Sequence, residues 1–387
     1  MLAKVLFSHQ NNEAETFMDH LYKSSGGLQI ATALNKKDLF LDQVRTWCDR
    51  VGASPYVEIS QEHDDGIQYI RIYANDVLHK LCQHADTSCL AVSLGLISEW
   101  SARDLTLEAV LSMAVSPVIF DFSSLSELES NLRMRVSVAC LARRTELNFD
   151  TSGLSRPEAY WSHVEGSGFI LKEGASLIDG IERALCPDIS GEHFSFSCQR
   201  ATEYLMLHSL AIELSATNPA KLKEIELQWR KKALIADDFL NAFLLEIGSS
   251  AAPFPMRCYV PGDRVWFKNP DDFSSNVKGY EGSWVIYMGG GQFTNLWDRS
   301  SPYTLEAKCI EIYHWRHSVR EDKLGTLEIN EDLVKELVEQ TLSSHVQVRN
   351  CIDAMLRYRD PQGVYEDGGC IDITRDTFRR VCPECIN

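Results

Sequence analysis

A cysteine opens a predicted helix in the stretch HFSFSCQRATEYLMLHSLAIEL, residues 193–214. Apolar residues follow it with helical spacing at Ala201, Leu205 and Ile212. The pattern places Cys198 in the first helical turn, where backbone N–H groups and the positive end of the helix dipole stabilise a thiolate. The position suits a nucleophile. The local pattern alone favours a small buried side chain, because free cysteine is commonly found in protein interiors.

The remaining cysteines carry little chemical signal. The chain has 12 cysteines in 387 residues without the spacing of a disulfide framework, and its N-terminal stretch has no secretory pattern. Reduced thiols and a cytoplasmic protein are therefore expected. Cys382 and Cys385 form a CxxC pair and Cys370 offers a third ligand, but a structural zinc site needs four. We expect no metal ion and no other cofactor, and we interpret the C-terminus as an exposed tail.

Charge and hydropathy exclude two classes of protein. The formal net charge is −17 and no cluster of Lys and Arg offsets it, so a general nucleic-acid binder is excluded. No apolar run reaches the ~18 residues that a membrane span needs. With 44% hydrophobic residues, the chain is typical of a globular protein of two or three domains. Its pattern carries no signal for an oligomeric state.

The order of predicted elements divides the chain into three parts. Residues 1–110 contain the strand pair YVEISQ and GIQYIRIYA and a helix capped by Ser101, which predicts a mixed α/β domain of unknown role. Residues 111–320 contain helices, then a polar helical stretch over 219–247. The strands RVWFKNP, SWVIYMGGGQFTNLW and AKCIEIYHWRH follow, in an α+β order. Residues 321–387 are predicted as a helical extension and tail.

Five pieces of the middle part, in order, resemble the bacterial spore-coat transglutaminases, which are protein-glutamine gamma-glutamyltransferases. The pieces are ELESNLRMRVSVACLA with Arg135, AYWSHVEGSGFILKEGASLIDGIERAL, FSFSCQRAT, PGDRVWFKNPDDF, and GYEGSWVI with GGGQFTNLW. They lie within residues 118–297, a little under half the chain. The resemblance implies an α+β, papain-like transglutaminase core, in which the nucleophile helix packs on an antiparallel sheet.

The same resemblance assigns roles to individual residues. In the family a cysteine attacks a glutamine carboxamide, releases ammonia and passes the acyl group to a lysine amine, assisted by a glutamate and a histidine. Cys198 matches the nucleophile, and Phe196 matches the phenylalanine of the family's Phe-Glu-Cys pattern. Ser283 stands in the place of the glutamate and Asn295 in that of the histidine. A thiol nucleophile needs a proton acceptor, so the usual partners are missing.

Three explanations are open. In the first, another residue supplies the base. Glu281, two positions before Ser283, faces the same side if the strand is extended. The candidate histidines are His193, His314 and His317. In the second, Cys198 works with helix-dipole activation alone while Asn295 orients the acyl oxygen. In the third, the fold is kept for binding and the chemistry is lost.

The sequence thus predicts a cysteine-dependent acyltransferase or amidase that forms an acyl-thioester at Cys198 and transfers it to an amine or water. We expect Cys198, Asn295 and Glu281 in catalytic positions. The side chains predicted to bind substrate are Trp284, Trp297, Ser283 and Phe196. The expected partner is a protein, amide or amine substrate. The alternatives are a non-catalytic interaction module on the same fold and a cysteine peptidase, which needs a histidine within hydrogen-bond reach of Cys198.

Overall fold

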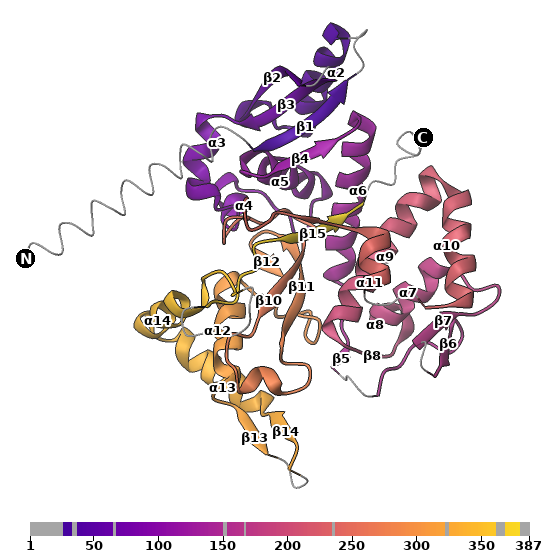
Figure 1. The fold of residues 1–387 in the computed structure, drawn as a ribbon, viewed down its shortest axis with the longest axis vertical. Helices are drawn as coiled ribbons and strands as arrows, with labels where there is room; N and C mark the ends of the chain where they lie inside the picture. The colour runs from indigo at the N-terminus through magenta and orange to yellow at the C-terminus, as the bar shows by residue number, and fades with distance from the viewer. Residues whose placement is uncertain are drawn as a thin grey trace, which may run out of the picture.

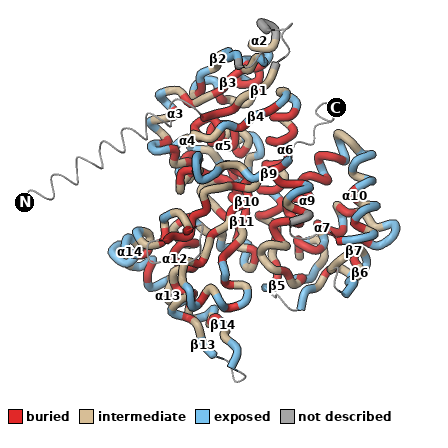
Figure 2. The backbone as a smooth tube through the Cα atoms, in the orientation of Figure 1, coloured by how far each residue is buried: buried red, intermediate tan, exposed pale blue. Residues whose placement is uncertain are grey.

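The computed structural model describes residues 26–32, 37–64, 67–149, 153–165, 168–233, 237–321, 325–360 and 368–379. Within these ranges the buried apolar side chains form three clusters. One cluster underlies an N-terminal sheet, one surrounds a central helix, and one lies under helices near the C-terminus (Figures 1 and 2). None of the described helices combines the length and the apolar character that crossing a bilayer requires.

The N-terminal sheet has the strand order β2-β3-β1-β4. β1 is antiparallel to β3 and parallel to β4, and β2 pairs antiparallel with β3 as the sequence predicted. The side chain of Ser101 accepts a hydrogen bond from the Asp104 N–H at 3.2 Å and caps α5, which packs on β1 and β3. The elements of this region are β1 (Gly27–Thr32), α2 (Lys37–Val51), η1 (Ser54–Tyr56), β2 (Val57–Asp64), β3 (Ile67–Ala74), α3 (Asp76–Leu81), η2 (Gln83–Ala85), α4 (Leu90–Leu94), α5 (Ala102–Val115) and β4 (Ile119–Phe122).

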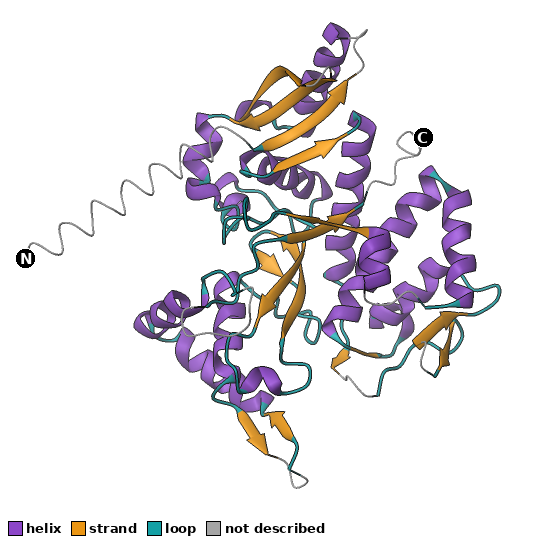
Figure 3. Ribbon diagram, viewed as in Figure 1, coloured by secondary structure: helices purple, strands orange, loops and turns teal. Residues whose placement is uncertain are grey.

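The central sheet is antiparallel throughout, in the order β12-β11-β10-β15-β9. Its strands are β9 (Leu244–Ile247), β10 (Arg264–Lys268), β11 (Gly282–Gly289), β12 (Gln292–Phe293) and β15 (Arg375–Phe378). β15 comes from the C-terminal segment and lies between two earlier strands (Figure 3). That segment was predicted as a helical extension, but it also supplies a strand to the sheet. The predicted helical stretch 219–247 is wrong at its end, where β9 pairs with β15.

Two long helices lie on this sheet. α6 and α9 pack against each other and against β11, which confirms the predicted packing of the helix that begins at Cys198 on an antiparallel sheet. α9 is buried on nearly every side, although Ile212, which was predicted on its apolar face, is 39% exposed. The elements around the two helices are α6 (Leu125–Ala142), β5 (Asn148–Phe149), β6 (Trp161–Val164), β7 (Gly168–Leu171), α7 (Leu177–Leu185), α8 (Pro187–Ser190), β8 (Ser195–Phe196), α9 (Cys198–Thr217), α10 (Pro219–Lys231) and α11 (Asp237–Phe243).

The segment AKCIEIYHWRH is a helix, so its prediction as a strand is wrong. It forms α12, whose N-cap Thr304 accepts a hydrogen bond from the Ala307 N–H at 3.1 Å. Its buried residues Leu305, Cys309 and Ile312 follow the spacing of a helix face. α13 and α14 pack on α12 (Figure 1). The elements here are η3 (Ser274–Asn276), α12 (Leu305–Trp315), β13 (Val319–Glu321), β14 (Leu327–Ile329), α13 (Glu331–Leu342) and α14 (His345–Met355).

A buried carboxylate joins the N-terminal region to the central sheet. Glu108 of α5 accepts hydrogen bonds from the Tyr287 hydroxyl at 3.1 Å and from the Gly290 N–H at 3.0 Å. Gly289 has φ +80°, and a Cβ there would lie 2.5 Å from Leu105 Cδ1. Burial raises the pKa of Glu108 above its ordinary value. The β11–β12 hairpin is therefore fixed by a helix from the N-terminal region.

The titration of His208 should make the stability of this fold depend on pH. The ring lies in α9 with 6% exposure and no hydrogen-bond partner on either nitrogen. Burial lowers its pKa from 6.5 to about 4. Between these values the unfolded chain binds a proton that the folded protein does not, so stability is lost as the pH falls. We expect the loss to reach about 3 kcal/mol between pH 7 and pH 4.

Urea unfolding of the wild type and of His208→Phe across this range measures the effect. Because phenylalanine keeps an apolar ring and removes the titration, the variant should gain about 3 kcal/mol on the wild type from pH 7 to pH 4. His63→Gln, at an exposed position in β2, is the control and should run parallel to the wild type. Parallel curves for His208→Phe and the wild type would contradict the prediction.

Candidate active site

Cys198 is the first residue of α9. The short strand β8 leads into it, and the side chain of Ser197 caps the helix by accepting a hydrogen bond from the Arg200 N–H at 3.3 Å. Phe196 is fully buried, with its ring 5.4 Å from that of Tyr204 and the Arg156 guanidinium 3.2 Å above it. Through these contacts Phe196 packs in the core and stabilises the turn before the cysteine. It is not part of the cavity wall.

The Cys198 side chain opens into a cavity of about 670 Å³. Its walls come from segments far apart in the sequence: the start of α9, the start of β11, the turn after β12, and the helices α12 and α13. The wall residues that carry chemistry are Cys198, Ser283, Asn295, Trp297, Asp298, Tyr303, Lys308, Glu311, Glu331, Lys335 and Glu339. The aromatic residues Phe149, Tyr280 and Trp315 line it as well.

Of the residues predicted for the site, four share this cavity: Cys198, Ser283, Asn295 and Trp297. Trp284 lies outside it, with its ring tilted against that of Trp266 at 5.0 Å and the Arg264 guanidinium 3.5 Å above it. Glu281 also lies outside it. Its carboxylate accepts a hydrogen bond from the Gly279 N–H at 3.1 Å, and it precedes the first residue of β11.

Asn295 organises the turn that presents Trp297. Its Oδ1 accepts hydrogen bonds from the N–H groups of Trp297 and Asp298, each at 3.2 Å, and its Nδ2 donates to the Ser301 carbonyl at 3.0 Å. The Trp297 ring then packs edge-on against Phe149 at 5.0 Å. An amide nitrogen carries two hydrogens, so Nδ2 retains one that can point at a ligand.

Opposing effects act on the Cys198 thiol. Burial raises its pKa above the ordinary value, and this is the largest effect. Hydrogen bonds from the backbone N–H groups of Trp284 and Gln199 lower the pKa, as do the positive charges of Lys308 and Arg264. The expected stabilisation by the helix N-terminus is therefore present, but desolvation outweighs it. The resting thiol is protonated at neutral pH.

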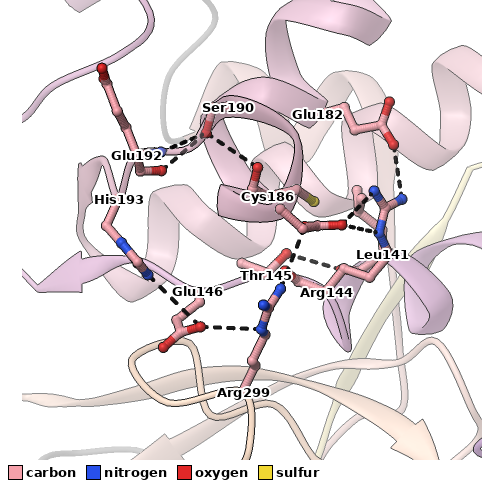
Figure 4. Close-up of polar contacts among 11 residues, drawn as sticks. Leu141, Arg144, Thr145, Glu146, Glu182, Cys186, Ser190, Glu192, His193 and Arg299 are labelled. Atoms are coloured by element: carbon pink, nitrogen blue, oxygen red, sulfur yellow. Dashed lines mark hydrogen bonds and ion pairs between the residues drawn. The ribbon is translucent and has the colours of Figure 1, made fainter.

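The candidate histidines lie elsewhere. Nε2 of His193 is 3.8 Å from an oxygen of Glu146, in a surface network that includes Arg299 (Figure 4). His314 is a buried residue of α12; its Nε2 lies 2.8 Å from the Thr341 hydroxyl, and burial lowers its pKa to about 4. The His317 ring lies 5.7 Å from that of His314. No histidine of the described ranges lines the cavity, so the partner that a peptidase mechanism requires is missing from that part of the chain.

The described residues offer no cluster of three His, Cys, Asp or Glu side chains that could hold a metal ion. Cys370, considered above as a zinc ligand, is buried with its sulfur 3.4 Å from that of Cys309. Cys382 and Cys385 lie outside the described residues.

Most of the wall residues were missed by the sequence analysis, among them Tyr303, Lys308 and Glu311. The alternation in AKCIEIYHWRH was taken for that of a strand, which would send Lys308 and Glu311 to opposite faces. In a helix, residues three and seven positions apart share a face. A test of helical spacing would have grouped Lys308, Glu311 and Trp315.

Comparison with known proteins gives the class. The profile of the protein-glutamine gamma-glutamyltransferase family matches residues 87–381. The chain therefore belongs to this family, as its five sequence pieces predicted. The match begins before residue 111 and continues past residue 320, and the domain boundaries proposed from the sequence remain a prediction.

Individual relatives are distant. A protein-glutamine gamma-glutamyltransferase of Halalkalibacterium halodurans is 25% identical over 181 residues, 45% of this chain and 57% of that protein. The chain thus spans a little over half the length of this relative. The solved transglutaminase from Geobacillus stearothermophilus (without C-terminal extension) shares 15% identity at a TM-score of 0.38, covering 56% of this chain and 97% of its own.

The turn held by Asn295 gives a testable expectation. Asn295→Ala removes two acceptor contacts and one donor contact, and should lower the free energy of unfolding by about 1–2 kcal/mol. Asn295→Asp keeps the two acceptor contacts but places a carboxylate oxygen opposite the Ser301 carbonyl oxygen, so it should destabilise the turn as well. Urea unfolding at neutral pH measures both. Asn276→Ala, at an exposed position of η3, serves as a control with an expected change within about 0.5 kcal/mol. Wild-type stability in Asn295→Ala would show that the turn holds without this side chain.

Proposed function

We propose that the protein is a cysteine acyltransferase of transglutaminase type, acting on protein glutamine through an acyl-thioester at Cys198. One arrangement carries the proposal: a cysteine at the N-terminus of the central helix opens into a large cavity. Membership of the gamma-glutamyltransferase family supports it.

The proposed reaction runs in two steps. In the first, the Cys198 sulfur bonds to the carboxamide carbon, the carbon–nitrogen bond breaks, and ammonia leaves with the thiol proton. In the second, an amine or water attacks the thioester and the thiol is restored. An amine gives a new amide, and water gives a glutamate side chain.

The cavity suits both the glutamine side chain and the amine acceptor of this reaction. The aromatic rings of Tyr280, Trp297 and Trp315 offer an apolar channel for the methylene groups and amide of a glutamine side chain. Asp298, Glu331 and Glu339 are exposed at the wall formed by α13 and the turn after β12. Their negative charge favours the approach of a cationic amine acceptor.

Two side chains fit the role of hydrogen-bond donor to the acyl oxygen. Ser283 occupies the family's glutamate position, is 8% exposed and lines the same cavity as Cys198. The second Nδ2 hydrogen of Asn295 is the other donor. We keep Asn295 as a catalytic residue of the proposal. Glu281, Trp284 and Phe196 support the site through the backbone and through packing.

A second candidate is a protein-interaction module that keeps the fold and has lost the chemistry. Two observations favour it: the residues at the family's glutamate and histidine positions do not titrate, and burial raises the pKa of Cys198. Both candidates suit a reducing compartment, because all ten described cysteines are free thiols. We propose the cytoplasm on that basis.

Alkylation by iodoacetamide with an intact-mass readout separates the two candidates. The rate at Cys198 should rise with pH through an apparent pKa above that of an ordinary thiol, because burial favours the protonated form. Ammonia release from carbobenzoxy-Gln-Gly with a dansylated amine acceptor should follow the same profile. Cys198→Ala should abolish both signals. Cys140→Ala, which removes an exposed cysteine from α6, should lose one labelling site and keep the ammonia release.

One outcome of these measurements would contradict the proposed enzymatic function. If Cys198 reacts only after unfolding and no ammonia is released between pH 7 and pH 10, the cysteine is packing. The fold then serves as a binding module.

A further inference from the structure

A lysine of α12 faces the cavity that holds the nucleophile. Lys308 and Glu311 are three residues apart and Trp315 is seven residues from Lys308, so all three lie on one face of the helix. All three line the same cavity as Cys198. The helix cap at Thr304 and the packing of α13 and α14 fix this face in place.

The ammonium group of Lys308 is held in a defined position. Lys308 is only 3% exposed, and its Nζ lies 2.8 Å from a carboxylate oxygen of Glu311. The same Nζ lies 4.2 Å from the centroid of the Tyr303 ring and 6.0 Å from that of Trp315. Burial raises the pKa of Tyr303 well above its ordinary value, and the neighbouring Glu311 carboxylate raises it further. A desolvated cation between a carboxylate and aromatic faces exerts a stronger field than one in water.

Two cations act on the Cys198 thiol, and only one of them lines the cavity. Arg264 of β10 is fully buried. Its guanidinium pairs with Asp376, donates a hydrogen bond to Thr202 and lies over the ring of Trp284. Lys308 faces the space in which an acyl group bound to Cys198 would lie. The other charged groups of the cavity, Asp298, Glu331, Lys335 and Glu339, are exposed to solvent, which screens them.

We propose that Lys308 supplies the positive charge that stabilises the Cys198 thiolate and the developing oxyanion, in a site that lacks the family's histidine. The inference rests on the proposed acyl transfer. Lys308 keeps its protons throughout: the sulfur–carbon bond forms, the carbon–nitrogen bond breaks, and the thiol proton leaves with ammonia. Glu311 and Tyr303 are positioning residues that hold the ammonium and moderate its charge.

The test uses opposite charge changes at this pair. Lys308→Met removes the cation, so the apparent pKa of Cys198 alkylation should rise by on the order of one unit. Glu311→Gln removes the neutralising anion, so the same pKa should fall. Lys308→Arg keeps the charge and should stay close to the wild type. A purely structural pair would not move the two profiles in opposite directions.

A matched control exists on another helix. Lys221 and Glu224 form the same three-residue ion pair on α10 at 2.9 Å, are exposed, and lie outside the cavity. Lys221→Met should leave the Cys198 profile unchanged. Circular dichroism confirms that each variant is folded before it is titrated. If Lys308→Met does not fold, the lower apparent pKa of Cys198 alkylation that is expected in Glu311→Gln still tests the proposal.

The experiments distinguish a failure of the proposed acyl transfer from a failure of the proposed role of Lys308. If Cys198→Ala keeps full ammonia release, the proposed function is wrong. If Cys198→Ala is inactive while Lys308→Met and Glu311→Gln both keep the wild-type profile, acyl transfer stands and the role of Lys308 is wrong. A rise in both charge variants would also overturn it, because it would indicate a general disturbance of the site.

Discussion

The buried guanidinium of Arg264 joins the three segments on which the site depends. It donates to the Thr202 hydroxyl of α9 at 2.9 Å, pairs with Asp376 of β15 and lies 3.5 Å from the ring of Trp284 in β11. Thr202 in turn donates to the Cys198 carbonyl at 3.1 Å. Breaking a buried ion pair by removing one partner costs about 3–5 kcal/mol, because the remaining charge is left uncompensated. The first turn of α9 is therefore coupled to the sheet and to the last described strand.

This coupling explains why the end of the chain matters to a cysteine in its middle. β15 is inserted between β10 and β9, so Asp376 reaches Arg264 only when the C-terminal segment has joined the sheet. The cavity likewise takes one wall from α12 and α13, which follow the sheet strands β9–β12 in the sequence. A segment that resembles an extension in the sequence thus completes the core. The site is built from contacts that are distant along the chain.

Features that depend on neighbours in the chain, such as helix starts, were predicted correctly. Features that depend on distant segments, such as the pairing of β15, were not. Ser101 and Cys198 at helix starts follow from capping and periodicity, which depend on neighbours in the chain. β15 could not be predicted, since Arg375–Phe378 has no apolar alternation and its pairing is decided by β9 and β10. For α12, the residues Ile310 and Ile312 favour a strand, but both are fully buried in a helix on which α13 and α14 pack, and this packing overrides that preference.

The same distinction holds at the site. The resemblance located Ser283, Asn295 and Trp297 around the cysteine because they match family positions near the nucleophile. Lys308 and Glu311 have no such match, and only the helical form of α12 brings them to the cavity.

The ionisation of the Cys198 thiol depends on the balance between desolvation and the positive groups around the sulfur. Desolvation alone would make the thiol inert, yet two N–H groups, Lys308 and Arg264 all favour the charged sulfur. A cysteine that serves only as packing gains nothing from such donors, because a protonated thiol is a weak acceptor. A carboxamide bound above the sulfur would displace water from the cavity and strengthen each of these interactions. The protonated resting state and the cationic surroundings are therefore compatible. Under the proposed function, the ionisation of Cys198 would then depend on an occupied site.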